Sequence, residues 1–106
     1  MARGIKDKVV IIGMGCSAFG EHWDKGADDL IVDSFEEAIA DANISRDQID
    51  AAWFGVCYEE QSLSKSAISL AQALRLPNLP ATRVENLCAT GSEALRGAVY
   101  AVAAGG

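Results

Sequence analysis

Residues 81–95 read ATRVENLCATGSEAL, and in this stretch a short β-forming segment leads straight into a helix. Residues 81–86 carry side chains typical of a strand, whereas the residues after Ser92 place small apolar side chains at helical spacing. These apolar positions are Ala94, Leu95, Ala98, Val99 and Val102, and Gly105 and Gly106 end the pattern. The stretch therefore predicts a strand, a tight junction and a helix.

Two further helices are predicted upstream. Apolar residues recur at helical spacing over residues 27–42 and again over residues 61–74, where two prolines downstream end the pattern. Asn43 is a predicted helix stop, and Ser45 with Gln48 three residues later forms a capping box for a short turn or helix.

Two further strands are also predicted, and both read as buried. Residues 8–14 (KVVIIGM) form a continuous apolar run without alternation, which is typical of a central strand covered on both faces, and residues 49–56 (IDAAWFGV) read the same way. The alternation of strands and helices predicts an α/β fold with a mainly parallel sheet, in one domain over residues 1–106, although residues 81–86 are also compatible with an antiparallel edge or interface strand.

The predicted last helix has almost no charge after Arg96. Such a helix is expected to be buried nearly all round. Since the alternation also stops where a fourth strand would begin, we expect the chain to be the truncated N-terminal part of a larger protein.

Charge and composition argue against several functions. The 106 residues have a formal net charge of -6 and no cluster of Lys and Arg, which argues against binding to nucleic acid or to an anionic membrane. No apolar segment is long enough to cross a bilayer. The three cysteines, Cys16, Cys57 and Cys88, lack metal-ligand and redox-pair spacing, so no metal site is expected and a reducing cytoplasm fits best.

The first candidate site is a glycine pair. Residues 13–18 (GMGCSA) fit a loose dinucleotide-binding pattern, with Asp33 roughly 20 residues on as a ribose-binding acid. That site needs a helix to begin on the glycines, whereas residues 19–26 read as a loop and Asp33 falls in a predicted helix. We therefore interpret the glycines as a tight turn after a buried strand.

The second candidate is Cys88, at the predicted strand-to-helix junction. A cysteine there points its sulfur at the positive end of the helix dipole and at free backbone N–H groups, which stabilises a thiolate nucleophile. Thr90, Gly91 and Ser92 supply small side chains, so that a substrate carbonyl can approach the sulfur and meet amide donors. The competing interpretation is a small buried hydrophobe.

The surrounding sequence favours the nucleophile. Residues 83–95 (RVENLCATGSEAL) resemble the nucleophile segment of thiolases, in particular the sterol-carrier-protein type and related bacterial and archaeal acetyl-CoA acetyltransferases. Residues 9–20 (VVIIGMGCSAFG) resemble the opening strand and loop of that family, and residues 49–56 resemble its next elements.

The resemblance implies an acyl-CoA acyltransferase. Cys88 would take an acyl group from a coenzyme A thioester and pass it to a second CoA species, or act in reverse in the thiolysis of a 3-ketoacyl-CoA, with its own N–H helping to bind the thioester oxygen. Coenzyme A thioesters would be substrates, and no permanently bound cofactor is implied.

This chain differs from thiolases in how much of the family's sequence it contains. Thiolases carry a His and a second Cys in their C-terminal half, and neither motif is present here, so the fragment alone is expected to be inactive. His22 matches no family role and reads as an ordinary loop histidine. Two alternatives to an acyltransferase remain open. Thiolase-like aldolases and condensing enzymes share the architecture of thiolases. A non-catalytic scaffold is the other alternative, but retention of the Cys88 segment argues against it.

The resemblance also implies partners. Residues 81–86 would pair with their equivalent across a two-fold axis to form a dimer, and a small OB-fold, zinc-ribbon protein is a further possible partner by analogy with related thiolases.

The remaining cysteine, tryptophan and acidic residues are interpreted as structural or surface residues. Cys16 and Cys57 are predicted to be structural, Trp23 and Trp53 to be packing groups, and Asp28, Asp29, Glu59 and Glu60 to be surface charges. Glu85 and Asn86 are expected near the site or at a subunit contact.

Overall fold

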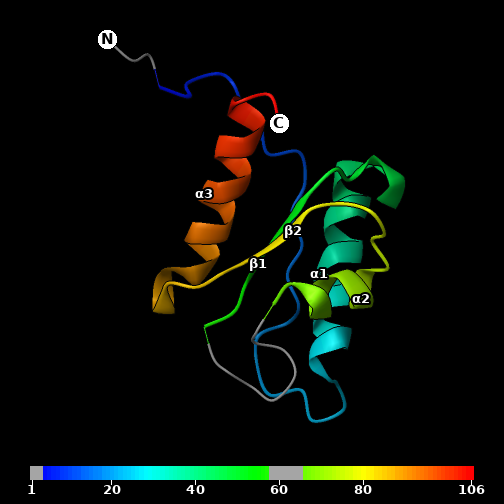
Figure 1. Cartoon of the computed structure of the whole chain (residues 1–106). Coiled ribbons are helices and arrows are strands. Elements are labelled where there is room, and N and C mark those ends of the chain that lie inside the picture. Colours follow the sequence, from blue (N-terminus) through cyan, green and yellow to red (C-terminus); the bar gives the residue numbers. More distant parts are fainter. Residues whose placement is uncertain (1–3, 58–65) are drawn as a thin grey trace.

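The computed structural model describes residues 4–57 and 66–106. Its elements in chain order are α1 (Ala27–Ala42), η1 (Arg46–Gln48), β1 (Ala52–Gly55), α2 (Ile68–Leu74), β2 (Ala81–Val84), η2 (Leu87–Ala89) and α3 (Thr90–Ala103). The two strands lie in the middle of the molecule, with α3 on one side and α1 and α2 on the other (Figure 1). The predicted α/β class is confirmed.

The sheet consists of β1 and β2 paired in parallel. Ala52 lies opposite Ala81, and Gly55 lies opposite Val84 at the other end. Both strands fall inside stretches predicted from sequence, and β2 runs parallel, not antiparallel. The connection between them contains α2, so the unit is a βαβ crossover, as a parallel pair requires.

Local sequence signals explain where α1 begins and ends. The Asp29 carboxylate accepts a hydrogen bond of 2.9 Å from the Gly26 N–H at the amino end. At the other end Asn43 adopts the left-handed conformation, with φ of 55°, and its N–H bonds back to the helix. The predicted helix over residues 27–42 and its stop at Asn43 are confirmed.

The short elements also follow their predicted signals. The Ser45 N–H donates to Gln48 Oε1 at 3.0 Å, so the capping box before η1 is present. Within the predicted helix over 61–74, residues 68–74 form α2. The next residue, Arg75, caps the helix with φ of 50°. Residues 61–65 lie outside the described part of the chain.

The predicted first strand is wrong in this structure. Residues 9–18 form no regular element and make no ladder with β1 or β2. The Met14 N–H donates to Asp41 Oδ2 at 3.0 Å, and a ladder bond from that group is therefore lost. The apolar side chains of this run face solvent, with exposed fractions of 79% for Val10 and 72% for Ile11. The apolar run gives the chain a tendency to extend but does not by itself supply a partner strand.

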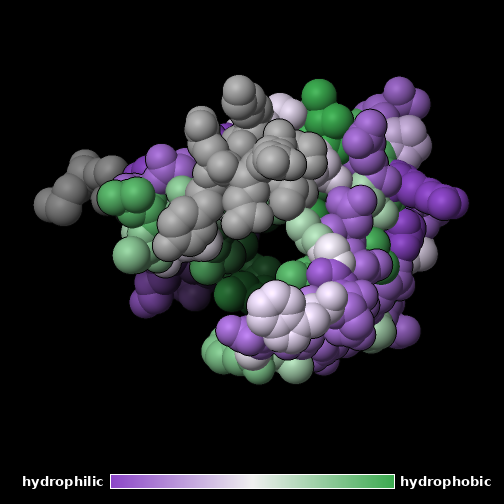
Figure 2. Space-filling model, turned by 90° about the horizontal axis from the view of Figure 1, so that it is seen from below, coloured by the Kyte–Doolittle hydropathy of each residue, from purple (hydrophilic) through white to green (hydrophobic). Residues whose placement is uncertain are grey.

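The core of the described chain is small. The buried apolar residues are Ala67, Leu74 and Leu76. The accessible surface is 7999 Å², against roughly 5,700 Å² for a folded monomer of this mass. Seen from below, hydrophobic atoms gather around an open hollow (Figure 2). Much apolar surface is therefore left uncovered, including Leu95 and Val102 on α3.

Within residues 4–57 and 66–106, no helix combines the length and the apolar character needed to cross a membrane.

Candidate active site at the junction of β2 and α3

The parallel pairing brings the carboxyl ends of β1 and β2 to one edge of the sheet. The Val56 N–H continues the ladder to the Val84 carbonyl at 3.3 Å. The Arg83 guanidinium donates back to the Val56 carbonyl at 3.2 Å, which fixes the chain just after β1. This is the edge at which open α/β sheets generally bind ligands.

A tight turn follows β2 and carries the chain into α3. The Ala89 N–H donates to the Asn86 carbonyl at 2.9 Å, and the Glu85 carboxylate accepts a hydrogen bond from the Leu87 N–H. Leu87 has φ of 45°, an uncommon conformation for a bulky residue. The turn is thus held in a single shape by several bonds to its own backbone.

Cys88 lies in this turn, within η2 and two residues before α3 begins at Thr90. It is an exposed, free thiol. A side chain placed on Gly91, in the first turn of the helix, would meet no atom within 4 Å, so the space beside the turn is open. The structure therefore places Cys88 at the strand-to-helix junction, as predicted, on the surface and not in the core.

Asn86 and Glu85 lie two and three residues before Cys88 in the same turn, and both are exposed. The carboxylate of Glu85 is committed to the turn itself through Leu87. Its role in this structure is to shape the backbone beside Cys88.

The glycine pair has a different role from the one that the dinucleotide pattern requires. No helix begins on Gly13 or Gly15, because α1 begins only at Ala27. A Cβ on Gly13 would lie 2.6 Å from the Ala38 carbonyl oxygen. The predicted tight turn is also wrong, since residues 13–18 form no turn and the backbone at both glycines lies directly against α1.

Asp33, the acid of the same pattern, is paired elsewhere. Its carboxylate lies 2.6 Å from Lys25 Nζ, within the stretch that leads into and along α1. That hydrogen bond and the charge of Asp33 raise the pKa of Lys25. The geometry gives no support to a ribose-binding role.

The only histidine of the chain makes its hydrogen bond within its own loop. His22 Nε2 donates to the Ala18 carbonyl oxygen at 2.5 Å within the loop before α1. It is a local loop contact, in agreement with the ordinary interpretation of this residue.

The other cysteines differ in their environments. Cys16 is exposed and its thiol donates to the Ser17 carbonyl at 3.2 Å, whereas Cys57 is half-buried just after β1. Among the described residues, no group of acidic, cysteine and histidine side chains is arranged to hold a metal.

One of the two tryptophans departs from its predicted role. Trp53 packs against α3, where a Cβ on Gly97 would lie 2.6 Å from the indole nitrogen. Trp23 is 89% exposed, so the prediction that it is a packing group is wrong in this structure. Asp28 and Asp29 are exposed, as predicted, while Glu59 and Glu60 lie outside the described residues.

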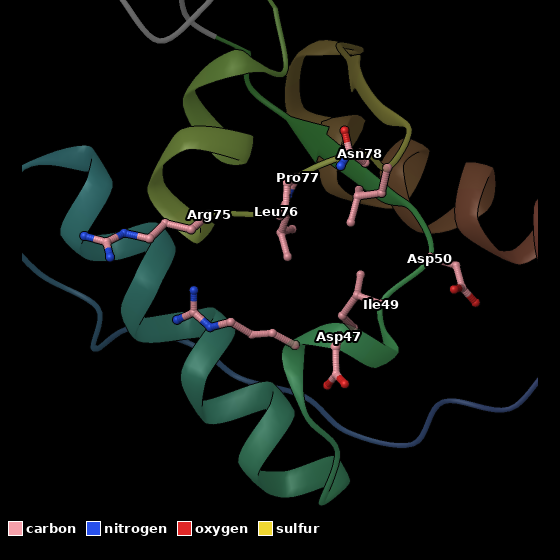
Figure 3. Close-up of a pocket in the computed structure, with 9 residues that line it drawn as sticks. Asp47, Ile49, Asp50, Arg75, Leu76, Pro77 and Asn78 are labelled. Carbon is pink, nitrogen blue, oxygen red and sulfur yellow. The ribbon is translucent and has the colours of Figure 1, made fainter.

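A pocket of about 440 Å³ lies at the opposite edge of the sheet. It is formed by the chain before β1 and the chain before β2, and Cys88 does not line it. Ile49 and Leu76 point toward each other across it, whereas the carboxylates of Asp47 and Asp50 point away (Figure 3). Charged and apolar residues both line this pocket, and the amino edge of a parallel sheet is not the usual place for a substrate.

Sequence reasoning missed two residues that shape the site. Thr90 was recognised only as a small side chain, yet its hydroxyl bonds to the turn on the other side of Cys88. Gly55, at the end of β1, makes close contact with Thr90. A threonine two residues after a cysteine carries no signal of such bonds, because the bonds depend on how the turn folds back.

Comparison with known proteins gives a consistent match. A family model described as "Thiolase, N-terminal domain" matches residues 9–106. The acetyl-CoA acetyltransferase of Methanothermobacter thermautotrophicus is 36% identical over 99 residues, which are 92% of this chain and 26% of that protein. The acetyl-CoA acetyltransferase of Methanocaldococcus jannaschii is 38% identical over 99 residues, which are 92% of this chain and 25% of that protein.

Sterol carrier protein 2 of Gallus gallus is also similar, at 32% identity over 90 residues, which are 83% of this chain and 16% of that protein. The chain thus spans about a quarter of the length of the two acetyltransferases that it matches, and less of the sterol carrier protein.

Proposed function

This chain belongs to the thiolase family, whose N-terminal domain it matches over residues 9–106, and on that premise we propose that the full-length protein is an acyl-CoA acyltransferase in which Cys88 carries the acyl group. The observation that carries the proposal is the place of Cys88. It is an exposed free thiol in the turn between β2 and α3, at the carboxyl edge of the sheet.

The chemistry follows from that placement. The Cys88 sulfur attacks the carbonyl carbon of an acyl group, and the bond from that carbon to its leaving group breaks. With an acyl-CoA the leaving group is the CoA thiolate, which takes up a proton. With a 3-ketoacyl-CoA the carbon–carbon bond breaks instead; the departing carbanion is protonated to give acetyl-CoA, and the shortened acyl group stays on Cys88.

The second half of the reaction regenerates the thiol. A CoA thiol, or the carbanion of a second acyl-CoA, attacks the acyl carbon and the carbon–sulfur bond to Cys88 breaks. Thiolysis and condensation therefore use the same covalent intermediate.

The amino end of α3 contributes electrostatic stabilisation. The first-turn N–H groups of a helix lack partners within the helix and carry a partial positive charge, which favours the oxyanion that forms on the substrate. Small residues around the thiol, above all Gly91, leave the space that an acyl group needs.

Proton transfer requires a base, and in the part of the chain that the structure describes the Glu85 carboxylate at the turn is bonded to the Leu87 N–H. The one histidine of the chain, His22, bonds within its own loop. We propose that the rest of the full-length protein supplies the base and that the isolated 106-residue chain does not turn over substrate.

The free edge of β2 supports a dimer. Among the described residues β2 pairs only with β1, so its other edge presents unpaired backbone groups. We propose that this edge pairs with the same strand of a second copy, which would bring two Cys88 turns close to one interface. An OB-fold, zinc-ribbon partner remains a prediction by analogy.

The test is intact-mass spectrometry of the full-length protein after incubation with acetoacetyl-CoA and with longer 3-ketoacyl-CoA substrates, followed by peptide mapping. We expect one acyl adduct, on Cys88. Cys16 is the internal control, since it is equally free and exposed but lies far from the turn in sequence and before α1.

Cys88→Ala is expected to remove both adduct and turnover while leaving the melting temperature nearly unchanged, because only one exposed sulfur is lost. Turnover in Cys88→Ala, or an adduct only on Cys16, would show that the nucleophile is elsewhere. A folded protein that forms no adduct with any chain length would favour a scaffold.

A further inference from the structure

Thr90 differs from the other polar residues around the turn. It is 6% exposed and is the buried polar residue of the described chain, although it stands between the exposed Ala89 and the exposed Gly91. A polar side chain buried at the first position of a helix must have its hydrogen bonds satisfied.

The Thr90 hydroxyl makes two bonds, one as acceptor and one as donor. It accepts from the Asn86 N–H at 2.9 Å and donates to the Leu87 carbonyl oxygen at 2.7 Å. Both partners lie before Cys88 in the chain, whereas Thr90 lies after it. The hydroxyl therefore closes a loop of backbone around the nucleophile.

The methyl group of Thr90 fixes the residue from the other side. A Cβ built on Gly55 would lie 2.7 Å from Thr90 Cγ2 and 3.1 Å from its carbonyl oxygen. The end of β1 therefore touches Thr90 so closely that a Cβ at position 55 would displace Thr90. Through this contact the turn is fixed to the sheet.

The turn needs such restraint because Leu87 has a positive φ. A leucine left to itself favours the ordinary right-handed or extended regions. Its N–H is held by Glu85 and its carbonyl by Thr90, so both peptide groups around it are restrained. A change of φ at Leu87 would swing Cys88, the next residue.

We infer that Thr90 is a positioning residue for Cys88: its hydroxyl and methyl hold the turn so that the sulfur meets the acyl carbonyl in a productive direction. This inference rests on the proposed acyl transfer. Small errors in the placement of a nucleophile reduce the rate of the chemical step far more than they reduce substrate binding.

The experiment compares three variants of the full-length protein in single-turnover acylation by acetoacetyl-CoA. Thr90→Val keeps the shape and removes the hydroxyl, and we expect the acylation rate to fall about tenfold or more with KM changed less than about threefold. Thr90→Ser keeps the hydroxyl and is expected to retain most of the rate. Ser34→Ala removes a part-buried hydroxyl that bonds to helix carbonyls in α1, and it should leave the rate unchanged.

Alkylation of Cys57 by iodoacetamide distinguishes positioning from unfolding, because that thiol is half-buried two residues after Gly55, the residue that contacts Thr90. We expect its alkylation rate to be the same in Thr90→Val as in the wild type. Gly55→Ala, which pushes on the Thr90 methyl, gives a second approach and is expected to lower acylation in the same way.

A wild-type acylation rate in Thr90→Val would overturn the inference, and so would a loss that is matched by faster alkylation of Cys57 or that Thr90→Ser shares in full. These outcomes are separate from failure of the proposed function, which would show as an absence of any adduct on Cys88 in the wild type.

Discussion

At the scale of single residues, Gly13 and Gly15 show how a motif can be present for a packing reason. A Cβ on Gly15 would lie 2.1 Å from the Ser34 carbonyl oxygen and 2.6 Å from the Ala38 N–H nitrogen. Both are backbone atoms of α1, which cannot move aside as the tip of a side chain can. The pair of glycines lets this segment lie directly on a helix.

Gly15→Ala is therefore expected to destabilise the full-length protein by roughly 1–3 kcal/mol, the usual range for overpacking. Gly91→Ala is the matched control, because its new methyl group would meet no atom within 4 Å. In a helix that change is expected to be neutral or stabilising by about 0.5–1 kcal/mol. Urea unfolding midpoints measure both, and a neutral Gly15→Ala would mean that the segment does not lie on α1.

Residue-scale prediction from the sequence succeeded where the signal is local. Asn43 and the Ser45 box specify their own backbone, and both are found as predicted. Cys88 was placed at the correct junction for the same reason. The role of Thr90 was missed because its hydroxyl bonds depend on how the turn folds back, and the exposure of Trp23 was missed because it depends on which distant segment lies nearby.

At the scale of elements, Arg46 joins three of them. Its guanidinium donates to the Leu74 carbonyl of α2 at 2.5 Å and pairs with Glu36 of α1, while it lies 5.5 Å from the Phe35 ring centre. One planar side chain at η1 thus connects the two helices on the same side of the sheet.

Arg46→Lys is expected to cost about 1–2 kcal/mol, since lysine cannot reproduce two differently directed bonds and a ring contact at once. Arg75→Lys is the control, because this exposed arginine lies at the end of α2 and the substitution keeps its charge. Arg75 has φ of 50°, and a change from one long side chain to another leaves the cost of that conformation unchanged. Thermal unfolding of the full-length variants measures the difference. Equal melting temperatures for the two variants would contradict the connecting role of Arg46.

The ion pair between Lys25 and Asp33 makes the stability of the protein depend on pH. The hydrogen bond that Lys25 donates to Asp33 raises the pKa of Lys25 above its ordinary value of 10.5. While Asp33 is ionised, the pair therefore contributes fully below pH 10.5 and is lost as the pH rises through the higher folded value. Both groups are partly exposed, so the effect is small and is screened by salt.

Asp33→Asn is expected to lower the pKa of Lys25 back toward its ordinary value, measured by NMR titration of the Lys25 ammonium. The stability lost in this variant should be visible at pH 8 and should vanish above the folded pKa. An unchanged Lys25 titration in Asp33→Asn would show that the pair does not form.

Elements were predicted well where one segment determines its own structure. The helix at 27–42 needs only its amphipathic pattern and its caps. The strand at 8–14 needed a partner, and periodicity cannot show whether one is present. In this structure the N–H of Met14 is taken by Asp41 and no ladder forms.

At the scale of the whole molecule, the chain exposes more surface than its size requires. Its radius of gyration is 14.5 Å, against roughly 12.9 Å for a compact domain of this length. A cavity of about 580 Å³ lies between Ile12, Trp53 and the face of α3 that carries Leu95 and Val102. Trp53 is covered on one side by Gly97 and lines this cavity on another.

The isolated 106-residue chain is therefore expected to be marginally stable. With 7999 Å² still exposed, unfolding would uncover about a fifth less surface than for a compact domain of equal mass, and the urea m-value should be smaller in proportion. The open apolar surface should bind the dye ANS and favour self-association. The full-length protein, tested in parallel, is the control and should bind less dye per mole. The contrary result would be cooperative unfolding of the isolated chain with a full-sized m-value and no ANS fluorescence. It would mean that the apolar faces pack against each other more tightly than the exposure of Ile11, Leu95 and Val102 indicates.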